Sequence, residues 1–327
     1  MNLRSMLRIF SATVLAITAV GFGSPARASY PDQVIRFVIP FGAGGPADII
    51  GRLFAEKLSR ELGQSVVVDN RPGAGGSIGA EYVTHLPADG YTLMLASPAV
   101  LAVNPSLYKS VAYNPITGFT PISLIANAPN VLVVLPSQPF TTLAGLVAYA
   151  KQHPGKLTFG SSGSGTSNHL GGEALKLQAG IDLLHVPYKS QAAAMQDLLG
   201  GRIDMIFDTL PTSIGPIRTG QLRPLALAAT ERSSLLPDVP TTAEAGAPGV
   251  IAGSWYSVMG PPAMPADIVD KLNRSLTSIC ADEVFATKLS ELGTSCLKST
   301  PGELHDFIQA QFNFWGGVIK KAKIPVE

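Results

Sequence analysis

The sequence predicts an α/β protein with two lobes, each built on a mainly parallel sheet with helices on both faces. Two runs of alternating strand-like and helix-like segments support this prediction, one on each side of residue 130. A mainly helical tail follows the second run and packs most simply on the first lobe. The chain then crosses between the lobes twice, near residues 130 and 254. Two crossings predict a hinge, with a cleft between the lobes.

The first run has the order strand, helix, strand, helix, strand. A β-branched segment that ends at a proline (33–40) precedes apolar residues at helical spacing (46–62), and Gly63 ends that helix. The other elements are a strand at 65–69, a helix at 77–84 and a strand at 91–96. In such a sheet, ligands bind in the loops beyond the carboxyl ends of the strands.

The second run follows a strand at 131–135 and repeats this alternation. Its strands are expected at 156–160, 183–189, 202–208 and 223–230, and its helices at 167–178 and 191–199. A strand at 254–259 leads into the tail, whose helices are expected at 266–279, 282–292 and 301–321. We therefore expect lobe 1 to comprise residues 29–130 and 254–327, and lobe 2 to comprise residues 131–253.

The first 28 residues have the pattern of a cleavable signal peptide. Arg4 and Arg8 precede an apolar stretch at 9–22, and Ala26-Arg27-Ala28 supplies a small-x-small cleavage site. The apolar stretch is too short to span a bilayer. The alternative is an N-terminal core helix, which would leave the basic start and the cleavage motif unexplained. We expect a soluble, exported protein with a periplasmic location.

Composition excludes several classes of function. The 327 residues are 46% hydrophobic and 14% charged, which is too apolar for a disordered chain. The formal net charge is +1 and the chain has no block of Lys or Arg, so we expect no nucleic-acid partner.

Two cysteines, Cys280 and Cys296, lie in the helical tail. In an oxidising compartment they can form a disulfide. The alternative is two independent buried thiols. The chain has no CxxC motif and no nearby histidine cluster, so we expect no metal site.

A glycine-rich loop at 41–48 follows the first strand and favours anion binding. Its glycines allow backbone N–H groups to turn inward, and Pro46 begins a helix whose positive end faces the cleft. The loop also fits a G-x-G-x-x-A dinucleotide motif, with Asp69 about 20 residues further on. Asp48 and Pro46 argue against a pyrophosphate, because one adds a negative charge and the other removes an amide donor. A third interpretation is a tight turn in which Asp48 caps the helix.

Two further loops follow strands on the same plan. The loop at 70–76 contains Arg71, which is either a cation near the site or a solvated side chain. The loop at 160–167 offers amides, hydroxyls and a helix N-terminus, a combination that suits a carboxylate.

The sequence predicts no catalytic residues. No serine of the 160–167 loop lies in a G-x-S-x-G motif, and no other motif completes a triad. His169 and His185 read as isolated histidines with structural or pocket-wall roles. Asp208 is expected to face the cleft, as a hydrogen-bond acceptor or a helix cap, rather than to pair with Asp204.

The sequence resembles the solute-binding proteins of tripartite tricarboxylate transporters, the Bug family, over essentially its whole mature length. The resemblance rests on collinear motifs in both lobes: VIPFGAGGPADIIGR (38–52), DNRPGAGGSIGAEYV (69–83), PADGYTL (87–93), NPSLY (104–108), FGSSGSGTSNHLGGE (159–173), HVPYKS (185–190), DLLGGRIDMIFD (197–208), LPDVPTTAEAG (236–246) and SWYSVMGPPAMP (254–265).

The resemblance implies a two-lobed fold of the periplasmic-binding-protein type, also called a Venus flytrap. It also implies that the first loop holds a ligand carboxylate, partly through ordered waters, and that the second lobe adds hydrogen bonds. Transferred by motif, the ligand-binding residues are Phe41, Gly42, Ala43, Gly44, Asp48, Ser161, Thr166, Ser167, Tyr188 and Asp208. One departure is Ser190, which stands where the family usually has glycine, so it either alters that turn or adds a hydroxyl to the pocket.

Together these features predict a monomeric, periplasmic binding protein without enzymatic activity and without a cofactor. It is expected to bind a mono-, di- or tricarboxylate between its lobes and to deliver it to the membrane subunits of a tripartite transporter. Two alternatives remain open, an exported enzyme of carboxylate metabolism and a ligand sensor for a membrane kinase.

Overall fold

The computed structural model describes residues 30–322, so the predicted signal peptide, residues 1–28, lies outside the described residues. The first half of the chain forms β1 (Ile35–Ile39), α2 (Pro46–Leu62), β2 (Val66–Asn70), η1 (Ala74–Gly76), α3 (Ser77–Thr84), β3 (Thr92–Ala96), the π-helical turn η2 (Ala99–Val103), α4 (Asn104–Leu107), β4 (Thr120–Val134), α5 (Leu143–Gln152) and β5 (Thr158–Ser161). The second half forms α6 (Ser167–Ala179), β6 (Leu184–Pro187), α7 (Gln191–Leu199), β7 (Met205–Thr209), α8 (Leu210–Arg218), β8 (Arg223–Leu227), β9 (Gly253–Gly260), α9 (Ala266–Ala281), α10 (Glu283–Ser290), β10 (Ser295–Cys296) and α11 (Pro301–Ala322).

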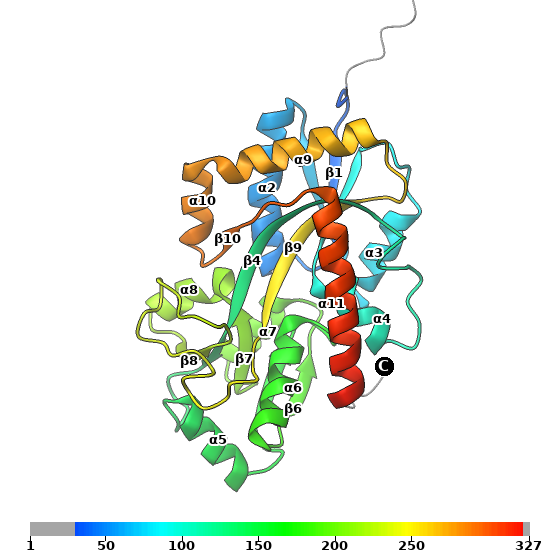
Figure 1. Cartoon of the computed structure of the whole chain (residues 1–327). Coiled ribbons are helices and arrows are strands. Elements are labelled where there is room, and N and C mark those ends of the chain that lie inside the picture. Colours follow the sequence, from blue (N-terminus) through cyan, green and yellow to red (C-terminus); the bar gives the residue numbers. More distant parts are fainter. Residues whose placement is uncertain (1–29, 323–327) are drawn as a thin grey trace, which may run out of the picture.

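One curled sheet connects two lobes, with the strand order β2-β1-β3-β9-β4-β7-β5-β6 (Figure 1). The strands β1, β2 and β3 are parallel to one another, and so are β5, β6 and β7. The central strands β4 and β9 run antiparallel to their neighbours. We refer to the part around β1, β2, β3 and β9 as lobe 1 and to the part around β5, β6, β7 and β8 as lobe 2.

In lobe 1, helices cover both faces of the sheet. Side chains of β1 alternate between the two faces, because Phe37 packs in the core beneath α2 and α9 whereas Val38 packs in the core beneath α3 and α11. From α2, Phe54 reaches the first core, and Gly63 ends that helix in the left-handed conformation at φ 68°.

Lobe 2 has the same three layers. Phe159 of β5 and Phe207 of β7 pack against α5 and α6 on one face. On the other face, Ile206 of β7 packs against α7 and α8. Two packed cores per lobe hold the carboxyl ends of the strands in place.

The strand β4 is much longer than the expected 131–135 and passes from one lobe to the other. Its first part pairs with β9 up to Pro129, and Asn130 to Val134 pair with β7. The ladder between β4 and β9 shifts register twice between Pro121 and Ala126. Proline in a strand is confined to edge strands and to irregularities such as these register shifts. Because β4 contains prolines, its sequence does not show the pattern of a long strand.

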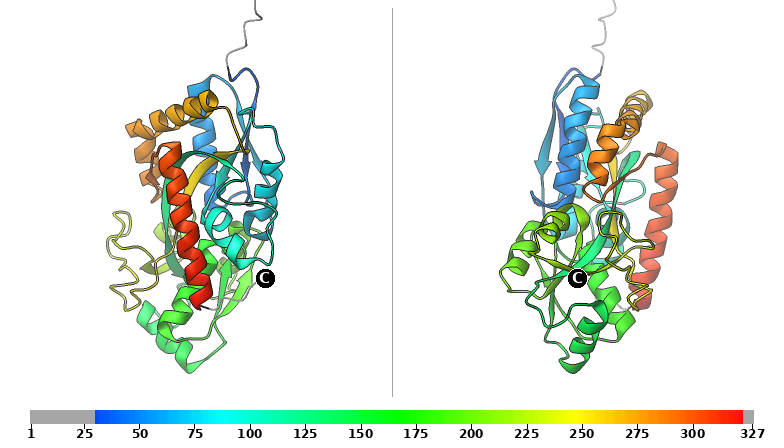
Figure 2. Two further views of the ribbon diagram at one scale, coloured as in Figure 1. Left: turned by 45° about the vertical axis from the view of Figure 1, so that its right-hand side comes forward. Right: turned by 90° about the vertical axis from the view of Figure 1, so that its left-hand side faces the viewer.

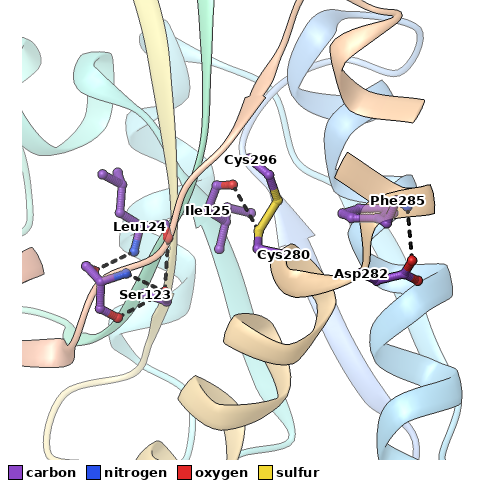
Figure 3. The surroundings of a disulfide bond; sticks show 8 residues. Ser123, Leu124, Ile125, Cys280, Asp282, Phe285 and Cys296 are labelled. Carbon is purple, nitrogen blue, oxygen red and sulfur yellow. Dashed lines mark hydrogen bonds between the residues drawn. A yellow bond between two sulfur atoms is a disulfide. The ribbon is translucent and has the colours of Figure 1, made fainter. Parts of the chain in front are cut away.

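The tail helices pack on lobe 1, and α11 runs beside both lobes (Figures 1 and 2). A disulfide joins Cys280 at the end of α9 to Cys296 of β10 (Figure 3). Within residues 30–322, no helix is long and apolar enough to cross a membrane. The same residues contain no cluster of three or more His, Cys, Asp or Glu that could hold a metal ion.

Candidate functional site

A pocket lies where the strand ends of both lobes meet, and it contains about 520 Å³ of empty space, part of it open to solvent. Lobe 1 lines it through the loop after β1, the turn after β3 and the strand β9. Lobe 2 lines it through the starts of α6 and α7 and the end of β7. The lining residues are Phe41, Gly42, Gly45, Pro46, Ala47, Ser97, Pro98, Ala99, Ser162, Thr166, Ser167, Asn168, Lys189, Ser190, Gln191, Thr209, Ser254 and Tyr256.

The N-termini of four helices of at least nine residues converge on this pocket. Its lining includes Pro46 at the start of α2, Ser167 at the start of α6, Gln191 at the start of α7 and Thr209, which caps α8. Each helix start presents backbone N–H groups without intrahelical partners and the positive end of the helix dipole. Of the described lining residues, Lys189 alone carries a charged side chain. The pocket is therefore electropositive mainly through its backbone.

The two lobes touch around the pocket, which indicates a closed conformation. A Cβ atom built on Gly42 of lobe 1 would lie 2.6 Å from the Cβ atom of Ser190 in lobe 2. A Cβ atom built on Gly75 would lie 2.7 Å from the carbonyl oxygen of Ser164. Both distances are shorter than real Cβ contacts, so only glycine permits this approach.

Asp48 belongs to the predicted site, but its carboxylate faces the inside of the 41–48 loop. It accepts hydrogen bonds from the Gly44 amide at 3.0 Å, from Arg52 Nε at 2.9 Å and from Asn70 Nδ2 at 3.0 Å. Burial raises the pKa of this carboxyl group, and the three hydrogen bonds outweigh that effect and hold the pKa below its usual value. Asp48 is absent from the pocket lining, so it shapes the loop from behind.

The 160–167 loop is ordered by its own hydroxyl groups. Thr166 Oγ1 donates to the carbonyl of Gly163 at 2.7 Å, and Ser162 Oγ donates to Asn168 Oδ1 at 3.0 Å. Ser167 Oγ and Ser254 Oγ lie 2.9 Å apart and link the start of α6 to β9. These bonds hold the polar side chains of the lobe 2 wall in place.

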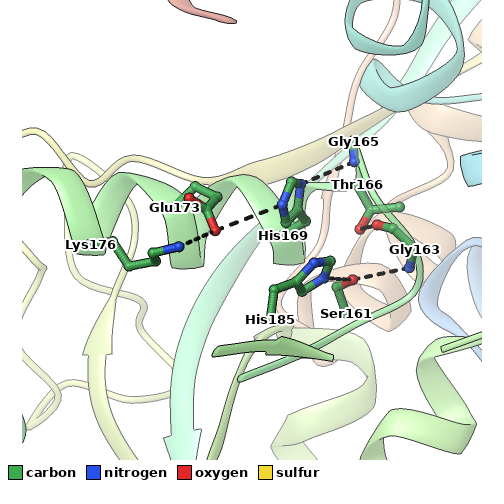
Figure 4. A network of polar contacts seen from close by, with 8 residues as sticks. All are labelled: Ser161, Gly163, Gly165, Thr166, His169, Glu173, Lys176 and His185. Atoms are coloured by element: carbon green, nitrogen blue, oxygen red, sulfur yellow. Dashed lines mark hydrogen bonds and ion pairs between the residues drawn. The ribbon is translucent and has the colours of Figure 1, made fainter. Parts of the chain in front are cut away.

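Behind this loop, His169 and His185 form a buried network, so the expectation of two isolated histidines was wrong (Figure 4). Their ring centroids lie 4.2 Å apart. His169 Nδ1 accepts a hydrogen bond from the Gly165 amide at 3.2 Å. His185 Nε2 lies 2.6 Å from Ser161 Oγ, which in turn accepts from the Gly163 amide at 3.1 Å.

Burial lowers the pKa of both imidazoles to about 4, with smaller contributions from Lys176 and, for His185, from His169. Both rings are therefore neutral near pH 7, and the His169 ring serves as an acceptor for the Gly165 amide of the loop. Ser161 is fully buried, which argues against a role as an exposed nucleophile.

Asp208 lies behind Gln191 and is fully buried. Its Oδ1 accepts from Gln191 Nε2 at 2.7 Å, and its Oδ2 accepts from Thr212 Oγ1 and Ser213 Oγ at 2.6 Å each. Burial raises the pKa of Asp208 to about 6, although these hydrogen bonds oppose the shift.

The structure therefore separates the ten predicted ligand-binding residues into groups. Four of them, Phe41, Gly42, Thr166 and Ser167, line the pocket. Asp48, Ser161 and Asp208 lie behind its wall, each bonded to a residue of the lining loops or helices. Ala43 and Gly44 are exposed beside it, and Tyr188 turns away to donate to Asp197 at 2.8 Å. Direct contact of these residues with a ligand stays a prediction.

Sequence reasoning missed several lining residues. Ser97 directly follows β3 at the same edge of the sheet. Because ligands bind beyond the carboxyl ends of the strands, this position could have been predicted. Gln191 and Asn168 lie in the first turns of their helices. Ser254 and Tyr256 belong to β9, and only the pairing of that strand brings them to the pocket. Ser190, noted as a departure from the family motif, lines the pocket. Its hydroxyl group caps α7.

A larger groove of about 1990 Å³ lies between α6 and α11, lined in part by the exposed apolar side chains Leu177, Ile251 and Phe314. No start of a long helix is among the described residues that line it. Its wall offers little to hold a small anion, so we take the smaller pocket as the ligand site.

This fold and pocket define a two-lobed binding protein of the periplasmic type. A protein-family model described as "Tripartite tricarboxylate transporter family receptor" matches residues 50–324. Protein BugT of Bordetella pertussis is 35% identical over 319 residues, which cover 97% of this chain and 98% of BugT.

Two solved structures are also similar. A protein of R. palustris with adipate is 38% identical, with a TM-score of 0.88 and coverage of 90% of this chain and 99% of that one. MatC of Rhodopseudomonas palustris with bound malate is 29% identical, with a TM-score of 0.85 and coverage of 89% and 100%. The chain belongs to the tripartite tricarboxylate transporter receptor family, which confirms the resemblance seen in the sequence.

Proposed function

We propose that this protein captures a small organic carboxylate in the pocket between its lobes and delivers it to the membrane subunits of a tripartite transporter. The observation that supports this most directly is the convergence of the N-termini of α2, α6, α7 and α8 on one pocket. A helix terminus stabilises a nearby anion by about 0.3–1 kcal/mol, and more where the site is partly buried. Because these N-termini come from both lobes, an anion between them stabilises the closed conformation.

The side chains of the wall agree with an anionic ligand. Asp48 and Asp208, the two buried carboxyl groups near the pocket, are occupied by internal hydrogen bonds. The remaining wall offers the hydroxyl groups of Ser97, Ser167 and Ser254, and the hydrogen bond between Ser167 and Ser254 leaves one of their two protons free for a ligand. Neutral donors of this kind suit a carboxylate.

Two solved relatives carry dicarboxylates, adipate in one and malate in the other. They support the proposed class of ligand. We also propose that the signal peptide at residues 1–28 directs the protein to the periplasm. There the protein delivers its ligand to the transporter. The dinucleotide interpretation has less support, because Gly44 of its motif is exposed beside the pocket and Asp69 is paired with Arg71.

The test is calorimetric titration of the purified mature protein with mono-, di- and tricarboxylates, together with small-angle scattering of the free and saturated protein. We expect saturable binding of one class and a smaller radius of gyration when the ligand is bound. Absence of binding to every acid would overturn the proposal. Binding without compaction would move the site away from the cleft between the lobes.

The enzyme alternative rests on one contact, the 2.6 Å approach of Ser161 Oγ to His185 Nε2. A hydrolytic role needs a nucleophile that the substrate can reach, whereas Ser161 is fully buried. We therefore propose binding without turnover. Analysis of each bound acid for products after prolonged incubation tests this, because any product would favour the enzyme.

A further inference from the structure

Ser97 carries a hydroxyl group that the protein leaves free and that remains accessible. The residue directly follows β3, lines the pocket and is 5% exposed. Within residues 30–322 its Oγ has no hydrogen-bond partner, yet it is not among the unpaired polar atoms that are sealed from solvent. Ser257 Oγ is such a sealed atom, and Ser257 does not line the pocket. The free hydroxyl group of Ser97 therefore faces the space of the pocket.

The strand β9 places further hydroxyl groups beside Ser97. The antiparallel ladder between β3 and β9, continued by one residue, places Ser97 opposite Tyr256. Ser254 lies two residues from Tyr256 and therefore on the same face of β9, and both residues line the pocket. Ser254 Oγ in turn lies 2.9 Å from Ser167 Oγ at the start of α6. Hydroxyl groups from both lobes thus gather on one part of the wall.

The start of α6 adds backbone donors at the same place. Its N-cap residue, Thr166, makes no side-chain hydrogen bond to the amides of the first turn, and its hydroxyl group donates to the carbonyl of Gly163. In α7, by contrast, Ser190 accepts from the amide of Ala193. The first turn of α6 thus keeps amide groups that can bind an anion.

We propose that Ser97 binds the ligand directly, by donating a hydrogen bond to its carboxylate. The inference rests on the proposed function and assigns the carboxylate to a serine subsite made of Ser97, Ser167 and Ser254. An ionised carboxylate only accepts hydrogen bonds, so it needs donors. The serine subsite supplies two protons, one from Ser97 and one that the bond between Ser167 and Ser254 leaves free. A carboxylate bound there also faces the positive end of α6.

The experiment compares Ser97 with a serine that the pocket does not reach. Calorimetric titrations measure the affinity of the wild type, Ser97→Ala and Ser257→Ala for propionate, succinate, malate, adipate and citrate. For the acid that the wild type binds most tightly, we expect Ser97→Ala to weaken binding about tenfold to a hundredfold, because a charged acceptor loses a donor. Ser257→Ala is the matched control and should bind as the wild type does, since its hydroxyl group is sealed from the pocket.

Two further measurements separate a contact with the ligand from a role in folding. Ser97 Oγ makes no hydrogen bond within residues 30–322, so the melting temperature of ligand-free Ser97→Ala should equal that of the wild type. Ser97→Cys keeps a weak donor of similar size and should recover part of the affinity. A crystal structure of the wild type with the bound acid should place a carboxylate oxygen within about 3 Å of Ser97 Oγ.

The outcomes distinguish this inference from the proposed function. If none of the five acids binds, both fail. If an acid binds and Ser97→Ala binds it as tightly as the wild type, this inference alone is wrong. It is also wrong if Ser257→Ala loses as much affinity as Ser97→Ala, or if ligand-free Ser97→Ala melts at a lower temperature. A crystal structure in which water or another group of the ligand occupies the place beside Ser97 Oγ would overturn it as well.

Discussion

Gly42 of lobe 1 and Ser190 of lobe 2 approach so closely that a Cβ atom on Gly42 would lie 2.6 Å from the Cβ atom of Ser190. The contact joins the loop after β1 to the residue that caps α7. Both residues line the pocket. The absence of one methyl group therefore permits the lobes to close here.

Gly42→Ala should impede closure. The added methyl group overpacks the contact, which costs about 1–3 kcal/mol and weakens ligand affinity about tenfold to a hundredfold. The open form has no such contact, so the melting temperature without ligand should change little. Calorimetry and small-angle scattering with a verified ligand measure both effects.

A compensating change tests the same contact. Ser190→Gly removes the opposing atoms and costs the N-cap only a few tenths of a kcal/mol. The double variant should recover most of the affinity lost in Gly42→Ala. Gly215→Ala, on α8 with no atom within 4 Å of the new methyl group, is the control for adding a methyl group. Equal affinity in Gly42→Ala and wild type would contradict a closure contact.

Asp48→Asn should destabilise the loop after β1 and weaken binding. The carboxylate accepts three hydrogen bonds, and a neutral amide would turn a donor toward Asn70 or Arg52. The expected loss is about 1–3 kcal/mol in the free energy of unfolding at pH 7. Glu56→Gln on the same helix is the control, because the ion pair of Glu56 with Arg60 is exposed and contributes little.

The pH dependence of this effect has a defined sign. The pKa of Asp48 is lower in the folded state than the 3.8 of an unperturbed aspartate. Its stabilising effect is therefore present above pH 3.8 and is lost as the pH falls through the folded pKa, so the wild type and Asp48→Asn should converge in acid. Tighter ligand binding by Asp48→Asn would show instead that this charge repels the anion.

The histidine pair should make the protein sensitive to acid. The pKa values of His169 and His185 are lowered from 6.5 to about 4. As the pH falls, these two histidines are therefore protonated in the unfolded chain before they are protonated in the folded protein. Stability is complete above pH 6.5 and is lost as the pH falls from 6.5 through 4, by at most about 1.4 kcal/mol per pH unit for each group. Urea unfolding between pH 4 and 7.5 measures this slope.

His169→Asn measures the contribution of one histidine to this pH dependence of stability. The Oδ1 atom of asparagine can accept from the Gly165 amide as Nδ1 does now, and it does not titrate. We expect the slope to fall by about one proton. His305→Asn, at an exposed position on α11, is the control for the loss of an imidazole. An unchanged slope in His169→Asn would contradict the assignment.

The disulfide between Cys280 and Cys296 closes a loop with a sequence separation of 16. The double variant Cys280→Ala/Cys296→Ala should lose about 3 kcal/mol of stability, because its unfolded chain is less constrained. Ligand affinity should stay the same, since neither cysteine lines the pocket. Mass spectrometry of the native protein should show two hydrogens fewer than the reduced protein. Free thiols in material from the periplasm would refute the pairing.

The sequence by itself determined the elements whose signals are local. The predicted bounds of α2, α3 and α7 match the structure, because proline or serine at the start of each helix, and glycine at the end of α2 and α7, act within one helical turn. It also placed the glycine loops at 41–48 and 160–167 at the strand ends that form the pocket. In contrast, α8 and most of β4 were missed, since Pro211, Pro216, Pro121 and Pro129 interrupt their patterns.

Only the tertiary structure decided which side chains line the pocket. Asp48 turned out to support its loop because Arg52 and Asn70 surround it, and His169 meets His185 only when α6 packs beside β6. Tyr256 reaches the pocket through the pairing of β9 with β4. Periodicity and capping act over a few residues, whereas these contacts join residues far apart in the chain. They depend on strand register and lobe closure, for which one sequence contains no local signal.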